Sequence, residues 1–258
     1  MRPVLKWVGG KTQLLEQVLS EFPEHIDDYY EPFVGGASVL LSVIPRVKGI
    51  ARASDLNPHL IALYRQIQSN PEGLIKELRA LERDTSEAAY YRRRDEFNRS
   101  PRPALFLYLN KVGFRGIYRE GPNGFNVPFG HYANPTVCDA ENIRKFSKLV
   151  ESVEFSCQGY DDALRGCGPS DFVYVDPPYT PETATSFTKY TAESFDHKKF
   201  FNFLKGLPAK WVMSNSNTKP VRDEFEEYDR VEVSARRAIN SRNPAARTTE
   251  LIISKKNI

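Results

Sequence analysis

The chain has 258 residues, of which 27% are charged and 40% hydrophobic, with a formal net charge of +3. This composition is typical of a soluble globular protein with one large core. No apolar run approaches the ~18 residues of a membrane span, and the N-terminus lacks the apolar stretch of a signal peptide. Three cysteines without a Cys-x-x-Cys pair, and four histidines without ligand spacing, predict a reducing compartment and no metal site.

The positive charge is concentrated in two segments. Residues 92–119 hold eight Lys or Arg and two acidic residues, and residues 236–256 hold six Lys or Arg and one acidic residue. Such clusters in a near-neutral chain predict contact with a polyanion, although solvated helix faces would produce the same pattern.

The first motif along the chain is a Gly-Gly pair at residues 9–10, flanked by Trp7 and Lys11. Its spacing does not match a phosphate loop, because Leu5 stands where that loop needs a glycine. An amphipathic helical segment follows. Trp7 and Lys11 are therefore candidates to close over a ligand. The alternative for Trp7 is a structural role, in which its ring packs in the core.

A second glycine turn follows a predicted strand at residues 29–34. Gly35 and Gly36 precede a predicted helix over 37–43, and Asp55 ends the next predicted strand, over 50–54. Asp55 lies nineteen residues after Gly36, which matches the spacing between a Rossmann-type glycine turn and the acid that binds ribose hydroxyls. Because the turn is not G-x-G-x-x-G, the pattern favours an adenosine cofactor without a pyrophosphate, such as S-adenosylmethionine.

Residues 57–109 predict successive helices with no intervening strand, and so an inserted lobe. The lobe ends in residues 110–130, where glycine, asparagine and proline alternate with aromatic residues and arginines, which predicts a hairpin and an ordered loop. Arginine can read guanine, and aromatic tips can wedge between bases. An ordinary surface hairpin remains the alternative.

The stretch Asp176–Tyr179 reads Asp-Pro-Pro-Tyr and follows a predicted buried strand over 172–175. Asp176 and the Pro177 carbonyl could accept two hydrogen bonds from the exocyclic amine of a base. Tyr179 could stack on a base flipped out of a duplex. The exocyclic amine of cytosine is as poor a nucleophile as that of adenine, so either base could be the substrate. For Asp-Pro alone, an ordinary surface Asp in a proline turn remains the alternative to a functional role.

The remaining elements complete a sheet. We expect a loop over 180–190, a helix over 196–204 and a strand over 210–214. A closing hairpin is expected from residues 230–235 and 248–254, with a basic tip at residues 236–242.

The motifs, taken in order, resemble those of the Dam-like, alpha-group adenine-specific DNA methyltransferases. They are Lys-Trp-x-Gly-Gly-Lys at 6–11, Glu-Pro-Phe-x-Gly-Gly at 31–36, a target-recognition insert, and Asp-Pro-Pro-Tyr at 176–179. The resemblance runs from about residue 5 to the end of the chain, and the insert looks like that of GATC-type members. It implies an α/β, Rossmann-like S-adenosylmethionine-dependent fold. Residues 1–56 and 151–258 would form the catalytic domain, and residues 57–150 the inserted target-recognition lobe.

The resemblance also implies site residues. The cofactor would be contacted by Trp7, Lys11, Gly35, Gly36, Asp55 and Asp176, and catalysis would use Asp176, Pro177 and Tyr179. DNA would be contacted by Lys6, Phe114, Arg115, Ile117, Arg119 and Pro128, with Lys6 and Arg119 reading guanines. Arg115 stands where Dam-like members commonly carry Asn, so a recognition sequence other than GATC stays open.

The function implied is methyl transfer from S-adenosylmethionine to the N6 amine of adenine in a short double-stranded site, with base flipping. No metal is expected, because the sulfonium electrophile is already activated. The enzyme would act on DNA in the cytoplasm of a bacterium or of a phage- or virus-infected cell, and a cognate restriction endonuclease is a candidate partner. The alternatives are a cytosine amino-methyltransferase and a catalytically silent DNA-binding protein. A silent protein would not need Trp7, Lys11 and Asp55 together.

Overall fold

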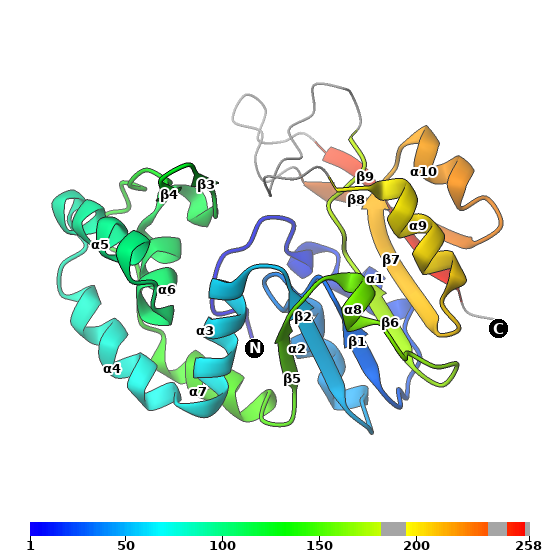
Figure 1. The fold of residues 1–258 in the computed structure, drawn as a ribbon, viewed down its shortest axis with the longest axis horizontal. Helices are drawn as coiled ribbons and strands as arrows, with labels where there is room; N and C mark the ends of the chain where they lie inside the picture. The colour runs from blue at the N-terminus through cyan, green and yellow to red at the C-terminus, as the bar shows by residue number, and fades with distance from the viewer. Residues whose placement is uncertain (182–194, 237–246, 256–258) are drawn as a thin grey trace. The chain divides into compact units, whose positions relative to one another are not determined.

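The computed structural model describes residues 1–181, 195–236 and 247–255 (Figure 1). These residues divide into two compact units. Unit 1 comprises Met1–Gly10, Val34–Ile44 and Ala53–Gln158, and unit 2 comprises Lys11–Phe33, Pro45–Arg52 and the described part of Gly159–Ile258. The predicted functional boundaries at residues 56/57 and 150/151 stay a prediction.

The sheet has seven strands in the order β5-β2-β1-β6-β7-β9-β8. The strands are β1 (Tyr29–Glu31), β2 (Ala51–Asp55), β5 (Glu154–Cys157), β6 (Phe172–Val175), β7 (Lys210–Ser216), β8 (Asp229–Arg236) and β9 (Arg247–Lys255). β6 runs parallel to β1 and to β7, whereas β9 runs antiparallel to both β7 and β8. Strand order reverses beside β1, as in doubly wound sheets that bind ligands at their carboxyl ends. The predicted Rossmann-like α/β class is confirmed.

Strand β6 is buried on both faces, which explains its unbroken apolar sequence. Phe172 and Tyr174 lie on one face, with ring centroids 4.7 and 5.5 Å from that of Phe22. Val173 and Val175 lie on the other face, in a core shared with α9 (His197–Gly206). This alternation is the two-residue period of a strand. It fixes the direction in which β6 delivers the residues that follow it.

The described part of unit 2 also contains short helical segments. These are η1 (Lys11–Gln13), α1 (Leu15–Ser20), α8 (Tyr160–Ala163) and α10 (Lys219–Glu224), and η2 (Ile44–Arg46) begins at the boundary between the units. The predicted closing hairpin is confirmed as β8 and β9. Most of the predicted loop at 180–190 and of the basic tip at 236–242 lies outside the described residues.

Unit 1 contains the predicted run of helices (Figure 1). They are α3 (Pro58–Ser69), α4 (Pro71–Glu82), α5 (Glu87–Arg99) and α6 (Pro103–Val112). The same unit contains the separately predicted α2 (Ser38–Val43) and a helix that was not predicted, α7 (Ala140–Leu149). Helix α6 packs against α3, α4 and α5, which explains its buried apolar run from Ala104 to Leu109. Asn57 and Asn70 cap α3 and α4 through side-chain oxygens that accept from the main-chain N–H groups of His59 and Gly73.

The predicted hairpin after α6 is also confirmed. A short η3 (Phe114–Gly116) leads to β3 (Glu120–Gly121) and β4 (Gly124–Phe125), which pair antiparallel. Asn98 of α5 holds this hairpin, because its amide accepts from the main-chain N–H of Phe125 and donates to the carbonyl of the same residue. Among the described residues, no helix is long and apolar enough to cross a membrane.

Candidate functional site

In unit 2 the Asp-Pro-Pro-Tyr stretch follows β6 directly. Val175 pairs with Met213 of the parallel strand β7, so the carboxyl ends of both strands face the same edge of the sheet. At the end of β7, the Asn215 side-chain oxygen accepts from the Thr180 N–H at 3.1 Å. The Ser216 hydroxyl donates to the Thr180 carbonyl at 2.7 Å. The chain just after Tyr179 is thereby held against β7.

Asp176 forms a close ion pair with Lys11, with Nζ 2.6 Å from Oδ2. The Lys11 side chain is 5% exposed and that of Asp176 is 18% exposed. The Lys11 ammonium also lies 5.0 Å from the centroid of the Tyr179 ring. The structure thus brings together three of the predicted site residues, two of which are 165 positions apart in the chain.

Burial raises the pKa of Asp176 to about 6, and Lys11 opposes this rise. The carboxyl group is therefore an anion at neutral pH and titrates only slightly below it. An anionic carboxylate in a sheltered site is a stronger hydrogen-bond acceptor than one in water.

Glu31, at the end of β1, is a site residue that sequence reasoning missed. It is 3% exposed and accepts a hydrogen bond from the Tyr29 hydroxyl at 2.6 Å. Burial raises the pKa of Glu31 to about 8, with the Tyr29 bond opposing and the Asp176 charge adding to the rise. Glu31 is therefore protonated at neutral pH. Its sequence signal was its place as the first residue of the Glu-Pro-Phe-x-Gly-Gly motif, at the end of a predicted strand.

Tyr179 is oriented by a second missed residue, Glu250 of β9. The Tyr179 hydroxyl donates to Glu250 Oε2 at 2.6 Å. Burial raises the pKa of Tyr179 well above its ordinary value, and the charges of Asp176 and Glu250 add to this effect. The phenol stays neutral, and its ring is held from the hydroxyl end.

In unit 1 the glycine turn, Gly35 and Gly36, packs against the side chain of Trp7. A Cβ atom on Gly35 would come within 2.8 Å of the Trp7 ring, and one on Gly36 within 3.2 Å of Trp7 Cβ. Gly35 also has a φ of +44°, a conformation that favours glycine. Ala37 ends the turn in the left-handed region, with φ 61°, just before α2 begins. The close approach of Trp7 explains why the turn uses glycine.

Asp55 is tied to the same turn. Its Oδ2 accepts from the Gly35 N–H at 3.1 Å, and its Oδ1 accepts from the Asn57 N–H at 2.9 Å. Burial raises the pKa of Asp55, and these main-chain hydrogen bonds oppose the rise. The carboxylate is therefore held in one orientation at the end of β2. Each of its oxygens can still accept from a hydroxyl group.

The predicted DNA-contact residues gather in unit 1 around the end of α6. Phe114 is 42% exposed, and the Arg115 guanidinium lies 5.2 Å from its ring centroid. Tyr132, which sequence reasoning missed, accepts a hydrogen bond from the Arg115 N–H through its hydroxyl at 3.0 Å. Its ring lies 4.4 Å from the Lys6 ammonium. Lys6, Phe114 and Arg115 are thus parts of one cluster.

The other predicted DNA-contact residues lie along the same hairpin. Pro128 is exposed, and its carbonyl accepts from the Phe114 N–H at 2.9 Å. Arg119 is exposed, and its Nε donates at 2.7 Å to the side-chain oxygen of Asn126, which is a neutral partner. Ile117, which directly follows η3, is half-buried.

Part of the basic run at 92–119 has a structural role. Arg93 is buried and donates to the carbonyls of Leu81, in the last turn of α4, and of Asp84, just after that helix. Arg102 pairs with both Glu77 and Glu96. The charge count alone therefore overstated how much of this segment is available to a polyanion. Among the described residues there is no group of three or more His, Cys, Asp or Glu that could hold a metal ion.

The sheet order and the carboxylates that follow its strands define a Rossmann-like α/β protein. A sequence model of the D12 class of N6 adenine-specific DNA methyltransferases matches residues 7–239, and the chain belongs to this family. The predicted Dam-like resemblance is confirmed, and the protein is an adenine-specific DNA methyltransferase. This membership favours adenine over the cytosine and the silent DNA-binding alternatives.

The chain is similar along most of its length to characterised relatives. It is 34% identical to the type II methyltransferase M.MjaIII of Methanocaldococcus jannaschii, over 93% of each chain. It is 33% identical to M1.LlaDCHI of Lactococcus lactis subsp. cremoris, over 98% of this chain and 95% of the relative. It is 34% identical to the DNA adenine methylase of Escherichia coli K12, over 93% and 90%.

Similarity to solved structures is weaker. The 23S rRNA methyltransferase ErmE matches 98% of this chain and 71% of its own, with a TM-score of 0.45 and 7% identity. This likeness is too low to inform function.

Proposed function

We propose that the protein transfers a methyl group from S-adenosylmethionine to adenine N6 in a short double-stranded site, GATC or a close relative of it, after flipping the adenine out of the duplex. The observation that carries the proposal is the ordered Asp-Pro-Pro-Tyr stretch. Its Asp176 is an anion at neutral pH paired with Lys11, and its Tyr179 is held by Glu250.

The residues of unit 1 fit the adenosine part of the cofactor. The glycine turn brings main chain close to a ligand without Cβ atoms in the way, and the fixed Asp55 carboxylate suits the two ribose hydroxyls. Trp7 supplies an aromatic face beside the turn. In unit 2, the Lys11 and Asp176 pair suits a ligand that carries both a carboxylate and an ammonium group, as the amino acid part of the cofactor does. The bound cofactor supplies a methyl group on a sulfonium, so no metal is needed for activation.

The chain's own residues prepare the amine. The lone pair of an exocyclic amine is delocalised into the ring, which makes the amine a poor nucleophile. Asp176 and the Pro177 carbonyl accept one hydrogen bond each from the amine, which favours a tetrahedral nitrogen with its lone pair available. Tyr179 stacks on the flipped base. Transfer would form the nitrogen–carbon bond as the bond between the methyl carbon and the sulfonium sulfur breaks, which would leave a neutral thioether. The nitrogen would then lose a proton, which the Asp176 carboxylate could accept.

Unit 1 reads the site. Lys6 and Arg119 donate to guanines, and Phe114, Ile117 and Pro128 contact or wedge at the bases. The Arg115 guanidinium lies beside the Phe114 ring. Arg115 therefore contacts a phosphate or a base with a cation, which a Dam-like enzyme with Asn at this position cannot do. Two relatives are type II methyltransferases by name, which supports a restriction-modification role with a cognate endonuclease. We expect the enzyme to act in the cytoplasm of a bacterium or of a phage- or virus-infected cell.

The test uses purified protein, S-adenosylmethionine with a labelled methyl group, and two unmethylated duplexes, one with GATC and one with the same bases scrambled. The products are digested to nucleosides. Label in 6-methyladenine from the GATC duplex alone is the expected result.

Label in 6-methyladenine from both duplexes would support the reaction but show that the enzyme is not specific for GATC. Label in a cytosine would contradict the proposal. So would the absence of label from every base of both duplexes and of unmethylated genomic DNA while the cofactor still binds.

A further inference from the structure

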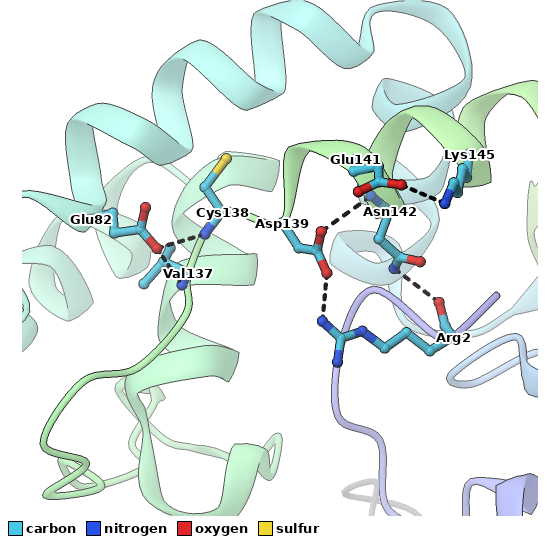
Figure 2. A network of polar contacts seen from close by, with 8 residues as sticks. All are labelled: Arg2, Glu82, Val137, Cys138, Asp139, Glu141, Asn142 and Lys145. Atoms are coloured by element: carbon cyan, nitrogen blue, oxygen red, sulfur yellow. Dashed lines mark hydrogen bonds and ion pairs between the residues drawn. The ribbon is translucent and has the colours of Figure 1, made fainter.

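The N-terminal segment Met1–Gly10 is anchored within unit 1 by polar side chains (Figure 2). The Arg2 guanidinium donates to Asp139 at 2.6 Å, and the Arg2 carbonyl accepts from the Asn142 amide at 3.0 Å. Asp139 also caps α7 through the Asn142 N–H. These contacts fix the segment four residues before Lys6.

A second buried amide, Asn110, fixes Lys6 itself. The Asn110 side-chain oxygen accepts from the Lys6 N–H at 2.9 Å, and its Nδ2 donates to the Lys6 carbonyl at 2.7 Å. The same Nδ2 donates to the Gly116 carbonyl at 2.8 Å. One side chain therefore joins the main chain at Lys6 to the main chain of the turn that contains Phe114 and Arg115.

Gly116 packs tightly on the other side of this junction. A Cβ on Gly116 would lie 2.6 Å from Lys6 Cβ and 3.1 Å from the Asn110 carbonyl, and its φ is +65°. Lys6 is thus held between an amide and a glycine with no spare room.

Asn110 is an amide at a buried position, where desolvation of a polar side chain is unfavourable. It is 4% exposed on α6, a helix whose preceding turns are wholly apolar and which packs against three other helices. A buried amide is tolerated there only because its hydrogen bonds are made, and a leucine would pack without that demand. The bonds that it makes go to the two segments predicted to read the DNA site.

We propose that Asn110 is a positioning residue for DNA recognition, which locks Lys6 and the 113–116 turn into one recognition surface. The inference rests on the proposed function, since it presumes that Lys6 reads DNA. Asn110 itself does not touch the bases. It determines where the Lys6 ammonium and the Phe114 ring meet them.

The experiment compares two matched pairs of variants. Asn110→Ala removes the amide that joins Lys6 to the turn, and Gln68→Ala removes a half-buried amide that bonds the carbonyls of Val150, Glu151 and Val153. Gly116→Ala inserts a Cβ against Lys6, whereas Gly166→Ala, with φ +89° and nothing within 4 Å, carries the same backbone strain without a contact. Thermal unfolding is measured for all four.

The readouts are the Kd of the preferred duplex, its ratio to the Kd of a duplex with one altered guanine, and the Kd of S-adenosylmethionine. Asn110→Ala and Gly116→Ala should each weaken binding of the preferred duplex on the order of tenfold and reduce the ratio. Cofactor affinity should change by less than about twofold. The two control variants should lose thermal stability only.

A variant cycle tests whether Asn110 acts through Lys6 and Phe114. In a background that carries both Lys6→Ala and Phe114→Ala, Asn110→Ala should add less than about threefold to the loss of duplex affinity, because the groups that it positions are already gone. Full additivity would overturn the inference, as would an unchanged Kd and ratio in both Asn110→Ala and Gly116→Ala.

Methylation of the duplex by the wild-type protein is measured in the same preparations. Its absence would overturn the proposed function and, with it, this inference. Wild-type methylation with unaffected variants would overturn the inference alone.

Discussion

Three ionisable side chains of unit 2 show how burial prepares a reactive group. Glu31 is buried and Asp176 is half-buried, and Asp176 forms a close ion pair with Lys11 whereas Glu31 accepts a hydrogen bond from the neutral Tyr29 hydroxyl. The pKa of Asp176 therefore rises to about 6 and that of Glu31 to about 8. At neutral pH one carboxyl is an anion and the other is neutral. This separation avoids two adjacent negative charges in a sheltered site.

We predict that Glu31→Gln removes a pH-dependent part of the protein's stability. The pKa of Glu31 lies above its ordinary value of 4.5 in the folded protein, so its stabilising contribution is full below about pH 4.5 and is lost as the pH rises through about 8. Glutamine does not titrate. The free energy of unfolding of the variant, relative to wild type, should therefore increase between pH 5 and 8, by at most about 1.4 kcal/mol per pH unit. Above pH 8 the difference should level off.

Urea unfolding at unit pH steps gives this difference directly. Glu141→Gln serves as the control, because Glu141 is exposed on α7 and pairs with Lys145. Its difference from wild type should not follow the Glu31 profile. A difference between Glu31→Gln and wild type that stays constant from pH 5 to 9 would show that Glu31 is not held protonated.

At the scale of elements, the turn between β1 and α2 depends on contacts that its sequence does not contain. The pair Gly35-Gly36 predicted a close approach of main chain and ligand, yet the structure shows that Trp7, almost thirty positions earlier, occupies one side of it. Ala37, the residue before α2, adopts the left-handed conformation that glycine usually takes. The turn is fixed by packing as much as by its own residues.

We predict that Gly35→Ala weakens cofactor binding by at least about tenfold, because the new Cβ meets the Trp7 ring at 2.8 Å and φ is +44°. The Kd of S-adenosylmethionine, measured by calorimetry, checks this result. Gly206→Ala is the control, since a Cβ there has nothing within 4 Å. Equal cofactor affinity in Gly35→Ala and wild type would show that the turn is not part of the cofactor site.

At the scale of the whole molecule, the order of elements was predictable from the sequence. The apolar run of β6, the helices of residues 57–109 and the closing hairpin follow from periodicity and turn residues, and the motif order indicated the family. The partners that hold the site were not predictable. Asn110 and Lys6 are 104 positions apart, and Glu250 and Tyr179 are 71 apart. A single sequence carries no signal for such pairs, because only the folded chain brings them into contact.

The basic segment at 92–119 illustrates the same limit. Its composition predicted a polyanion surface, but charge alone cannot show which arginines are neutralised. Arg93 donates to main-chain carbonyls at the end of α4, and Arg102 forms ion pairs with two glutamates. Arg119 instead donates to a neutral amide side chain. Burial and pairing, which depend on helix packing, decide which cations remain available to DNA.

The most direct test of the central claim is the single-turnover rate of methyl transfer to the preferred duplex in wild type and Asp176→Asn. Asparagine keeps the shape but loses the anion, so transfer should fall by at least about 100-fold while the cofactor still binds. The wild-type rate should fall as the pH drops through about 6, where Asp176 takes up its proton. Asp223→Asn, an exposed residue paired with Lys219, should leave the rate unchanged. Transfer by Asp176→Asn at the wild-type rate would contradict the account.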